Sequence, residues 1–463
     1  MTTDNCRKEE KSEAKMEEPR ESLTQLPNGV MVDKAEREKS ILPNGTYIPT
    51  IESVLNHHNI KEAIKAVKSN KGAPGIDGIT TTELDQFMQK NWTQIKQAIL
   101  EGAYQPNPVK RVNIPKPEGN GVRQLGIPSM MDRVIQQAVH QELVKVFDPI
   151  FSDHSYGFRP NRNAHQAVLQ AQEYIQEGCE YVVDIDLEKF FDKVNHDMLM
   201  ARVARHVKDK KILLLIRRFL QAGVMEDGLV KITDEGTPQG GPLSPLLSNI
   251  MLDDFDKELE KRGLRFVRYA DDCNIYVKTE RAGQRVMEAT VRYLTKVLKL
   301  KVNQQKSAVD KPKNRKFLGF TFTEEAEIKI HESRFKRLKD KVRKITKKMR
   351  GSKLEDSIPK SLMPTVRGWA NYFGLAQIRS VFDSLDGWIR RRLRDIIWRQ
   401  WKRPRTRYKR LIAMGIKKHT AKTAAYSSKG PWRMALTYVM HNAFSNGVIE
   451  SMGYVPMVKI VNS

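Results

Sequence analysis

The sequence has very few cysteines: Cys6, Cys179 and Cys273 are the three among its 463 residues. They form no CxxC pair and no Cys/His cluster of zinc spacing, so we expect reduced thiols and no structural zinc. Long apolar runs are also missing, because no stretch approaches the roughly 20 residues that span a bilayer. The first 25 residues are charged and lack the apolar core of a signal peptide. These absences predict a soluble protein of the cytoplasm, or of the bacterial nucleoid, with no membrane partner.

Acidic residues are scarce relative to basic ones. The chain has 81 Lys and Arg against 55 Asp and Glu, which gives a formal net charge of +26. An excess of this size favours a polyanionic partner, and nucleic acid is the better interpretation. A basic protein of the membrane surface is the competing one. The 40% of apolar residues suffices for buried cores, and the length predicts roughly three domains.

The composition changes twice along the chain. Residues 1 to about 50 mix charges of both signs with few aromatics, which predicts a disordered tail. From 51 to about 325, helical segments alternate with short strand-like runs, the pattern of a mixed α+β core. Beyond 330, amphipathic helical stretches dominate and strand signals fade until the last few residues. Between 331 and 420 there are 27 Lys or Arg against 7 Asp or Glu.

Aromatic residues and arginines share this basic segment. The aromatics recur at helical spacing, which is more typical of core residues than of base-stacking platforms. The arginines exceed what the solubility of a helix requires, so they predict a phosphate-binding surface. The candidate nucleic-acid-binding residues of the segment are Arg390, Arg391, Arg392, Arg394, Arg403 and Arg405.

Two adjacent aspartates stand between strand-like runs in LRFVRYADDCNIYVK, from Leu264 to Lys278. The pattern predicts a β-hairpin with Asp271 and Asp272 at its tip. Paired aspartates are also common in ordinary exposed turns, so the motif does not by itself indicate chemistry.

Upstream carboxylates occur in YVVDIDLEKFFDKVNHD, where a strand-like run passes into a helix-like segment. Strand alternation places Val182, Asp184 and Asp186 on one face. Charges in an apolar strand are unfavourable unless they are paired or bind metal, although an edge strand with a solvated face also explains Asp184. Three carboxylates from two strands suit nucleotidyl transfer by two Mg²⁺ ions about 3.5–4 Å apart. The residues alone do not decide whether Asp184 or Asp186 is the metal ligand.

The Tyr-Ala-Asp-Asp box resembles that of reverse transcriptases of the group II intron maturase type. Further blocks follow in the order of that family over residues 51 to about 400. The similar blocks are NKGAPGIDGIT from Asn70, KRVNIPKPEGNGVRQLGIP from Lys110, HSYGFRPNRNAHQAV from His154, DLEKFFD from Asp186, GTPQGGPLSPLLSNI from Gly236, LKLKVNQQKS from Leu298, FLGF from Phe317 and RGWANYF from Arg367.

The resemblance implies an α+β right-hand polymerase with fingers, a palm built on an antiparallel sheet, and a helical thumb. It divides the chain into a disordered tail over 1–50, fingers and palm with an N-terminal extension over 51–325, a maturase-type thumb (domain X) over 326–400, and a basic DNA-binding-like segment over 401–463. The Cys/His clusters of the endonuclease that many members carry at the C-terminus are not found, so we expect the type that lacks this domain.

The resemblance also assigns roles. DLEKFFD selects Asp186 as a metal ligand together with Asp271 and Asp272, and Leu187 could add its backbone carbonyl. Phe191 corresponds to the bulky gate that excludes a ribose 2′-hydroxyl; a core Phe beside Phe190 is the alternative. The remaining candidates are Lys116 and Arg123 on the triphosphate, Gln239 beside the gate, Lys306 as proton donor to pyrophosphate, and Tyr269 on nucleic acid.

The implied function is an RNA-directed DNA polymerase of a group II intron. It would extend a DNA primer on intron RNA with deoxynucleoside triphosphates, using two Mg²⁺ ions. It would also bind intron RNA to assist splicing and retrotransposition into a DNA target. A free-standing reverse transcriptase in DNA repair or defence, or a splicing-only RNA-binding maturase, is the alternative; the intact aspartates argue against the latter.

Overall fold

The chain is described by a computed structural model over residues 23–25, 31–33, 47–115, 122–226, 229–231, 235–236 and 240–462. These residues form two compact units. Unit 1 takes its residues from 1–152 and 189–254, and unit 2 takes its residues from 153–188 and 255–463. Within the described ranges, no helix is both long enough and apolar enough to cross a membrane.

The expected disordered tail over 1–50 lies largely outside the described residues. Two short strands within it, β1 (Leu23–Gln25) and β2 (Met31–Asp33), pair antiparallel. Tyr47 is buried in unit 1, where its hydroxyl donates a hydrogen bond to the Glu142 carboxylate. The packed part of unit 1 therefore includes residues from 47 onward.

Unit 1 is mainly helical, and several of its helices begin at side chains that cap free backbone N–H groups. Thr50, Ser129 and Asp209 each accept a hydrogen bond from an N–H of the first turn. The helical segments are α2 (Ile51–Val54), α3 (His57–Ser69), α4 (Leu84–Leu100), α5 (Met130–Phe147), the 3-10 turn η1 (Asp148–Ile150), α7 (Phe190–Lys193), α8 (His196–His206), α9 (Lys210–Gln221) and the first part of α10 (Ser244–Lys261).

A four-stranded sheet in unit 1 has the order β4-β3-β6-β7. Strand β3 (Val109–Pro115) pairs antiparallel with β4 (Val122–Ile127) and parallel with β6 (Val224–Glu226), and β6 pairs antiparallel with β7 (Leu229–Lys231). The segment that joins β3 to β4 lies outside the described residues.

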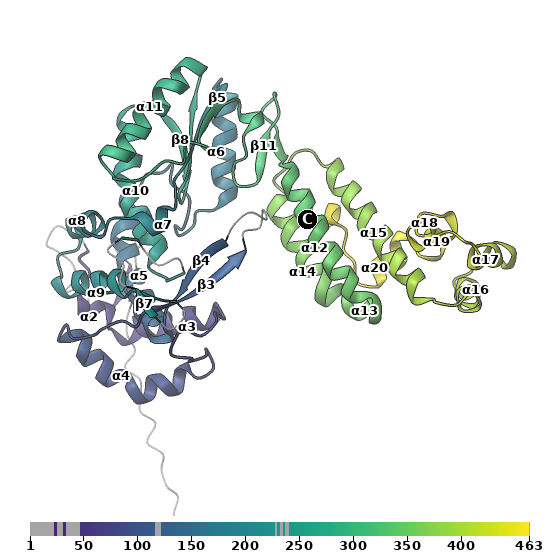
Figure 1. Cartoon of the computed structure of the whole chain (residues 1–463), viewed down its shortest axis with the longest axis horizontal. Helices are drawn as coiled ribbons and strands as arrows, with labels where there is room; N and C mark the ends of the chain where they lie inside the picture. Colours follow the sequence, from purple (N-terminus) through teal and green to yellow (C-terminus); the bar gives the residue numbers. More distant parts are fainter. Residues whose placement is uncertain are drawn as a thin grey trace, which may run out of the picture. The chain divides into compact units, whose positions relative to one another are not determined.

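A second four-stranded sheet forms the first part of unit 2. Its order is β10 (Ala308–Asp310), β5 (Tyr181–Asp186), β9 (Asp272–Val277) and β8 (Arg265–Tyr269), and every neighbouring pair is antiparallel. Helices α6 (Ala164–Gln176) and α11 (Glu280–Lys296) pack against it (Figure 1). Val182 joins the core beneath α6, whereas Val183 lies under Gly283 of α11, as strand alternation requires. The predicted hairpin, its partner strand and the α+β class are confirmed.

The rest of unit 2 is helical after a small hairpin of β11 (Phe320–Phe322) and β12 (Ile328–Ile330). One apolar core runs from α6 through this hairpin into the helices that follow. In the described residues no strand follows Ile330. The helical segments are η2 (Pro312–Asn314), α12 (Glu332–Lys348), η3 (Met349–Gly351), α13 (Leu354–Ser357), η4 (Ile358–Leu362), α14 (Met363–Phe373), α15 (Ser380–Gln400), α16 (Pro404–Ala413), α17 (Lys418–Ala425), α18 (Pro431–Met434), α19 (Tyr438–Ala443), α20 (Asn446–Ser451) and α21 (Met457–Val461).

The strand-like character expected of the last few residues is wrong, because they form helix α21. The buried carboxylate of Asp386 accepts hydrogen bonds from the backbone N–H groups of Met457 and Val458, at 2.9 and 3.3 Å. A side chain of the distant helix α15 thus caps the first turn of α21. Such a cap is not visible in the local sequence, where the apolar run resembles a strand.

Candidate functional site

The ends of two neighbouring strands bring the predicted carboxylates together in unit 2. Asp186 is the last residue of β5, and it lies directly opposite Asp272, the first residue of β9. Asp271 precedes Asp272 in the hairpin turn. Two residues earlier on β5, Asp184 lies opposite Asn274. Since residues directly opposite each other on antiparallel strands share a face, Asp184, Asp186 and Asp272 line one side of the sheet.

This concentration of carboxylates disfavours negative charge at its centre. Burial is the largest of the effects that raise the pKa of the Asp272 carboxyl to about 8, and the neighbouring carboxylates of Asp184, Asp271 and Asp186 contribute to the same increase. The Asp272 side chain keeps some exposed surface, but the surrounding groups give it little hydration. A bound cation would relieve this repulsion. Such a perturbed acid among other acids is typical of a functional site.

Asp184 and Asp186 differ in their partners. Arg315 donates to Oδ2 of Asp184 from Nε at 2.9 Å and from Nη2 at 2.5 Å. Burial raises the pKa of Asp184, and Arg315 opposes that effect. Asp186 is more exposed, at 38% of its side chain, and its Oδ2 lies 3.3 Å from Nζ of Lys306. Asp184 is thus bound by a guanidinium within the chain, whereas Asp186 faces a largely solvated ammonium group.

The segment from Asn303 to Ser307 supports the backbone of Asp186. The N–H of Asn303 donates to the Asp186 carbonyl at 2.8 Å, and the N–H of Asp186 donates to Oγ of Ser307 at 2.9 Å. The next residue, Leu187, is buried and pairs with Val302. Lys306 is carried by the same segment, so the position of its ammonium group is coupled to the end of β5.

A fully buried arginine fixes the hairpin turn that carries Asp271 and Asp272. Arg268 is 1% exposed, and it donates to both carboxylate oxygens of Asp256 at 2.7 and 2.6 Å. Its Nη1 donates to the carbonyl of Ala270 at 2.9 Å. Ala270 has a left-handed backbone with φ of 59°, a conformation that needs such support in a residue other than glycine.

Gly157 allows the backbone of a second segment to approach this turn. A Cβ atom at Gly157 would lie 2.3 Å from the backbone nitrogen of Ala270. Sequence reasoning assigned no role to Gly157, Arg268, Asp256 or Arg315. The signal that could have identified Arg268 is a charge in an otherwise apolar strand beside the aspartates, because a buried charge needs a partner.

The described residues contain no group of three or more His, Cys, Asp or Glu side chains already gathered around a common point as metal ligands. Like charges repel, so carboxylates on adjacent strands turn apart unless a cation holds them. The donors themselves fit a hard divalent ion, since all are carboxylate oxygens and Asp272 is strongly disfavoured as an anion without one.

The predicted nucleotide-binding residues divide between the units. Phe191, in α7 of unit 1, is half-buried, and its ring packs edge-on against Phe190 at 5.3 Å. Arg123 is exposed on β4 of unit 1, opposite Ile114. Lys116 and Gln239 lie outside the described residues. Lys306 is the one of these candidates placed in unit 2 beside an aspartate.

The predicted arginine surface separates into packed and exposed residues. Arg394 is 2% exposed and donates to the Phe444 carbonyl at 2.9 Å. Arg391 lies 3.8 Å above the ring of Trp432 and donates to its carbonyl at 3.0 Å. Arg392 donates from Nη2 to Oγ1 of Thr346 at 2.8 Å. These three side chains join helices of unit 2.

Two other arginines of the run are free to meet solvent. Arg403 and Arg405 are exposed at the start of α16, and Arg390 is half-buried in α15. Tyr269 is partly buried opposite Asp272, at the end of β8. An external phosphate therefore has access to Arg403 and Arg405 rather than to Arg394.

An antiparallel sheet with acidic residues at the meeting ends of two strands is the arrangement of a palm-type nucleotidyltransferase site. Residues 114–322 match the family described as "Reverse transcriptase (RNA-dependent DNA polymerase)". Residues 335–424 match "Group II intron, maturase-specific domain". The chain therefore belongs to the group II intron type of reverse transcriptase and maturase, and the predicted family is confirmed.

Curated relatives agree with this assignment. Protein YkfC of Escherichia coli K12 is 33% identical over 290 residues, which are 54% of this chain and 76% of YkfC. The group II intron-encoded protein LtrA of Lactococcus lactis is 38% identical over 206 residues, 44% of this chain and 34% of LtrA. The putative COX1/OXI3 intron 2 protein of Saccharomyces cerevisiae is 34% identical over 203 residues, 43% of this chain and 23% of that protein. The chain thus spans about a third of the length of LtrA and a smaller share of the yeast protein.

Proposed function

We propose that the chain is an RNA-directed DNA polymerase that extends a DNA primer on an RNA template at the ends of β5 and β9. The observation that carries this proposal is the pairing of Asp186 with Asp272, beside Asp271. The match of residues 114–322 to the reverse transcriptase family supports the same activity. Intron-encoded relatives favour an intron role over free-standing repair or defence.

Asp186, Asp271 and Asp272, with the carbonyl of Leu187, are the proposed ligands of two Mg²⁺ ions. Such ions, when bound, activate the primer 3′-hydroxyl and neutralise charge on the triphosphate. The chain itself contributes fixed geometry, because the Asn303–Ser307 segment and Arg268 hold the backbones of the two strand ends. Lys306 could give a proton to the leaving pyrophosphate, since its ammonium group is exposed beside Asp186.

Four residues are proposed to act on the incoming deoxynucleotide. Lys116 and Arg123 would neutralise the triphosphate, Gln239 would support the nucleotide, and Phe191 would exclude the ribose 2′-hydroxyl. The half-buried ring of Phe191 supports this role, because a gate needs both an exposed edge and a packed base.

Binding of intron RNA, and with it assistance to splicing and mobility, is proposed for the basic helical part of the chain. The maturase-specific match over 335–424 supports it. In the proposed division, 51–325 forms fingers and palm, 326–400 the thumb, and 401–463 a DNA-binding segment for the target and primer. The exposure of Arg403 and Arg405 supports this role, and the position of Tyr269 opposite Asp272 supports a proposed contact with the primer–template.

Primer extension on an RNA template tests the polymerase proposal. With Mg²⁺ and deoxynucleotides, the wild-type chain should make cDNA, and Asp271→Asn should make none, because it removes a proposed ligand without changing the size of the side chain. Equal synthesis by the two proteins would refute the metal assignment.

Splicing of the intron RNA in which the reading frame lies tests the maturase proposal separately. Asp271→Asn should still promote this reaction, because RNA binding does not use the carboxylates. If the wild-type chain makes cDNA but neither binds the intron RNA nor promotes its splicing, the result would favour a free-standing enzyme.

A further inference from the structure

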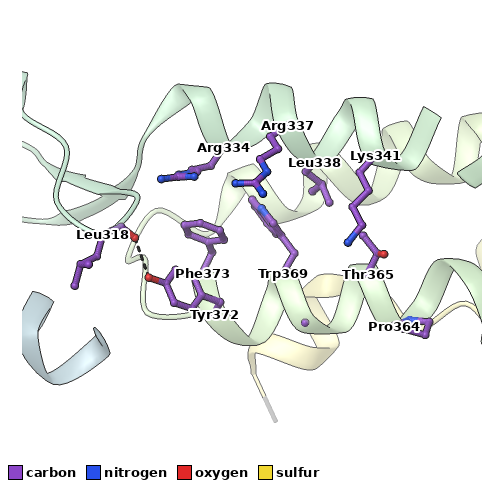
Figure 2. Close-up of a pocket in the computed structure, with 11 residues that line it drawn as sticks. Leu318, Arg334, Arg337, Leu338, Lys341, Pro364, Thr365, Trp369, Tyr372 and Phe373 are labelled. Atoms are coloured by element: carbon purple, nitrogen blue, oxygen red, sulfur yellow. Dashed lines mark hydrogen bonds between the residues drawn. The ribbon is translucent and has the colours of Figure 1, made fainter. Parts of the chain in front are cut away.

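A pocket outside the carboxylate site opens between α12 and α14 in unit 2 (Figure 2). We name it the α12–α14 pocket; its volume is about 420 Å³. Helix α12 supplies Arg334, Arg337 and Lys341, and α14 supplies Trp369 and other aromatic side chains. At one end, the hydroxyl of Tyr372 donates to the carbonyl of Leu318 at 2.9 Å.

The cations of the pocket lack acidic partners. In the part of the chain that the structure describes, no carboxylate forms an ion pair with Arg334, Arg337 or Lys341. Nε of Arg334 is buried and has no hydrogen-bond acceptor among the described residues. On another face of the same helix, by contrast, Arg343 pairs with Asp340 at 2.6 Å. Three positive charges thus converge on one cavity without compensation, which favours an anionic occupant.

Gly319 leaves the space that Arg334 needs at the edge of the pocket. A Cβ atom at Gly319 would lie 2.9 Å from Nε of Arg334. Its φ of 92° is also a conformation that other residues rarely adopt. The loop before β11 therefore leaves room for the guanidinium at the edge of the pocket.

An aromatic floor lies beneath these cations. The half-buried indole of Trp369 packs against Phe335, Phe373 and Phe382, with ring centroids 6.1, 4.8 and 5.9 Å away. These contacts make it a rigid surface, while the same ring lines the pocket. A flat apolar floor beside unpaired cations suits a ligand that has both a planar ring and a phosphate.

We propose that the α12–α14 pocket binds one unstacked nucleotide of a single-stranded nucleic acid. Its base lies against Trp369, and its flanking phosphates contact Arg334, Arg337 and Lys341. The volume is within the range of about 300–1,000 Å³ that small-ligand sites occupy. A simple anion would use the cations but not the aromatic floor. The inference rests on the proposed function in that the chain must handle nucleic acid, and RNA and DNA share the required chemistry.

Salt dependence of oligonucleotide binding tests the phosphate contacts. The full chain is titrated, in EDTA, into labelled oligouridylate or oligothymidylate of about 12 nucleotides, within the site sizes known for single-strand binding. The slope of log K against log salt is negative, and each lost phosphate contact should reduce its magnitude by about 0.7. The double variant Arg337→Gln with Lys341→Gln should therefore reduce the magnitude by about 1.4. Lys336→Gln with Lys347→Gln removes the same charge from other exposed positions of α12 and should change the slope little.

The contrast between the two double variants decides the proposal. The proposal is supported if the slope with either oligomer is shallower for Arg337→Gln with Lys341→Gln than for Lys336→Gln with Lys347→Gln. The oligomer that shows this difference identifies RNA, DNA or both as the ligand. Equal slopes for the two variants would overturn it. The assay contains no Mg²⁺, so a chain that fails to make cDNA but keeps this contrast would refute the polymerase proposal alone.

Crosslinking of the unmodified chain tests the base contact without any substitution. Oligouridylate containing 4-thiouridine should crosslink, on irradiation, to the tryptic peptide over 368–379, which contains Trp369 and Tyr372. Crosslinks confined to other peptides would overturn the proposal.

Discussion

At the scale of single residues, Asp184 and Asp186 differ in the kind of cation that each carboxylate meets within the chain. Asp184 is bound by Arg315, which also donates to the carbonyl of Lys306 at 2.6 Å. Arg315 therefore ties β5 to the segment that carries Lys306. Asp186 has no such bidentate partner among the described residues, and its carboxylate faces the end of β9.

Phe191 provides a test of nucleotide selection. Phe191→Ala should raise incorporation of ribonucleotides relative to deoxynucleotides by about tenfold or more, because the clash with a 2′-hydroxyl is removed. The ratio of kcat/KM for UTP and dTTP measures this. Phe190→Leu is the matched control, since Phe190 is a core residue that is 2% exposed, and the substitution leaves an apolar side chain there. An unchanged ratio for Phe191→Ala would leave Phe191 as an ordinary core residue.

At the scale of elements, the hairpin between β8 and β9 is held by residues from outside it. Arg268 binds the turn from within β8, and Asp256 of α10 neutralises Arg268. Gly157 brings a separate segment against Ala270. The turn that presents Asp271 and Asp272 is therefore rigid because three parts of unit 2 meet there.

Gly157→Ala should disturb this turn. Its added methyl group would press on backbone, which cannot move as a side chain can, so a loss of about 1–3 kcal/mol in the free energy of unfolding is expected. The rate of primer extension by Gly157→Ala should also fall, because the turn carries Asp271 and Asp272. Gly351→Ala is the control, because a Cβ there meets nothing within 4 Å. Urea denaturation checks the stability, and equal midpoints for the two variants would contradict the account of the turn.

Experiments should also distinguish the exposed arginines of the basic segment, which are proposed to bind DNA, from the buried Arg394, which stabilises the fold. Arg403→Gln with Arg405→Gln should lower the salt slope of duplex DNA binding by about 1.8, two contacts at about 0.9 each, and leave the melting temperature unchanged. Arg394→Gln should instead lower stability by about 1–3 kcal/mol, because the Phe444 carbonyl loses its buried donor. Loss of DNA affinity in Arg394→Gln at unchanged stability would contradict this division.

The sequence predicts those elements whose pattern is local. Alternation over Tyr181–Asp186 and the paired runs around Asp271 were sufficient for the strand and the hairpin, because burial imposes a period of two. The choice of Asp186 over Asp184 needed family resemblance, since alternation places both on one face. Roles that depend on distant partners were not predictable: Arg394 is buried by residues some 50 positions away, and α21 is capped by Asp386.

At the scale of the whole molecule, charge and family assignment coincide. The net charge of +26 is concentrated in the helical part of unit 2, and the maturase-specific match lies there. The carboxylates and their supports also belong to unit 2, whereas Arg123 and Phe191 belong to unit 1.

The central claim is that Asp186, rather than the Asp184 that Arg315 binds, helps to hold the ions for DNA synthesis on RNA. Primer extension by Asp186→Asn beside Asp184→Asn tests it most directly, since the two substitutions are identical in chemistry and two residues apart. Asp186→Asn should lose at least about a hundredfold in rate, and Asp184→Asn should lose clearly less. Full activity in Asp186→Asn, or equal losses in the two variants, would contradict the account.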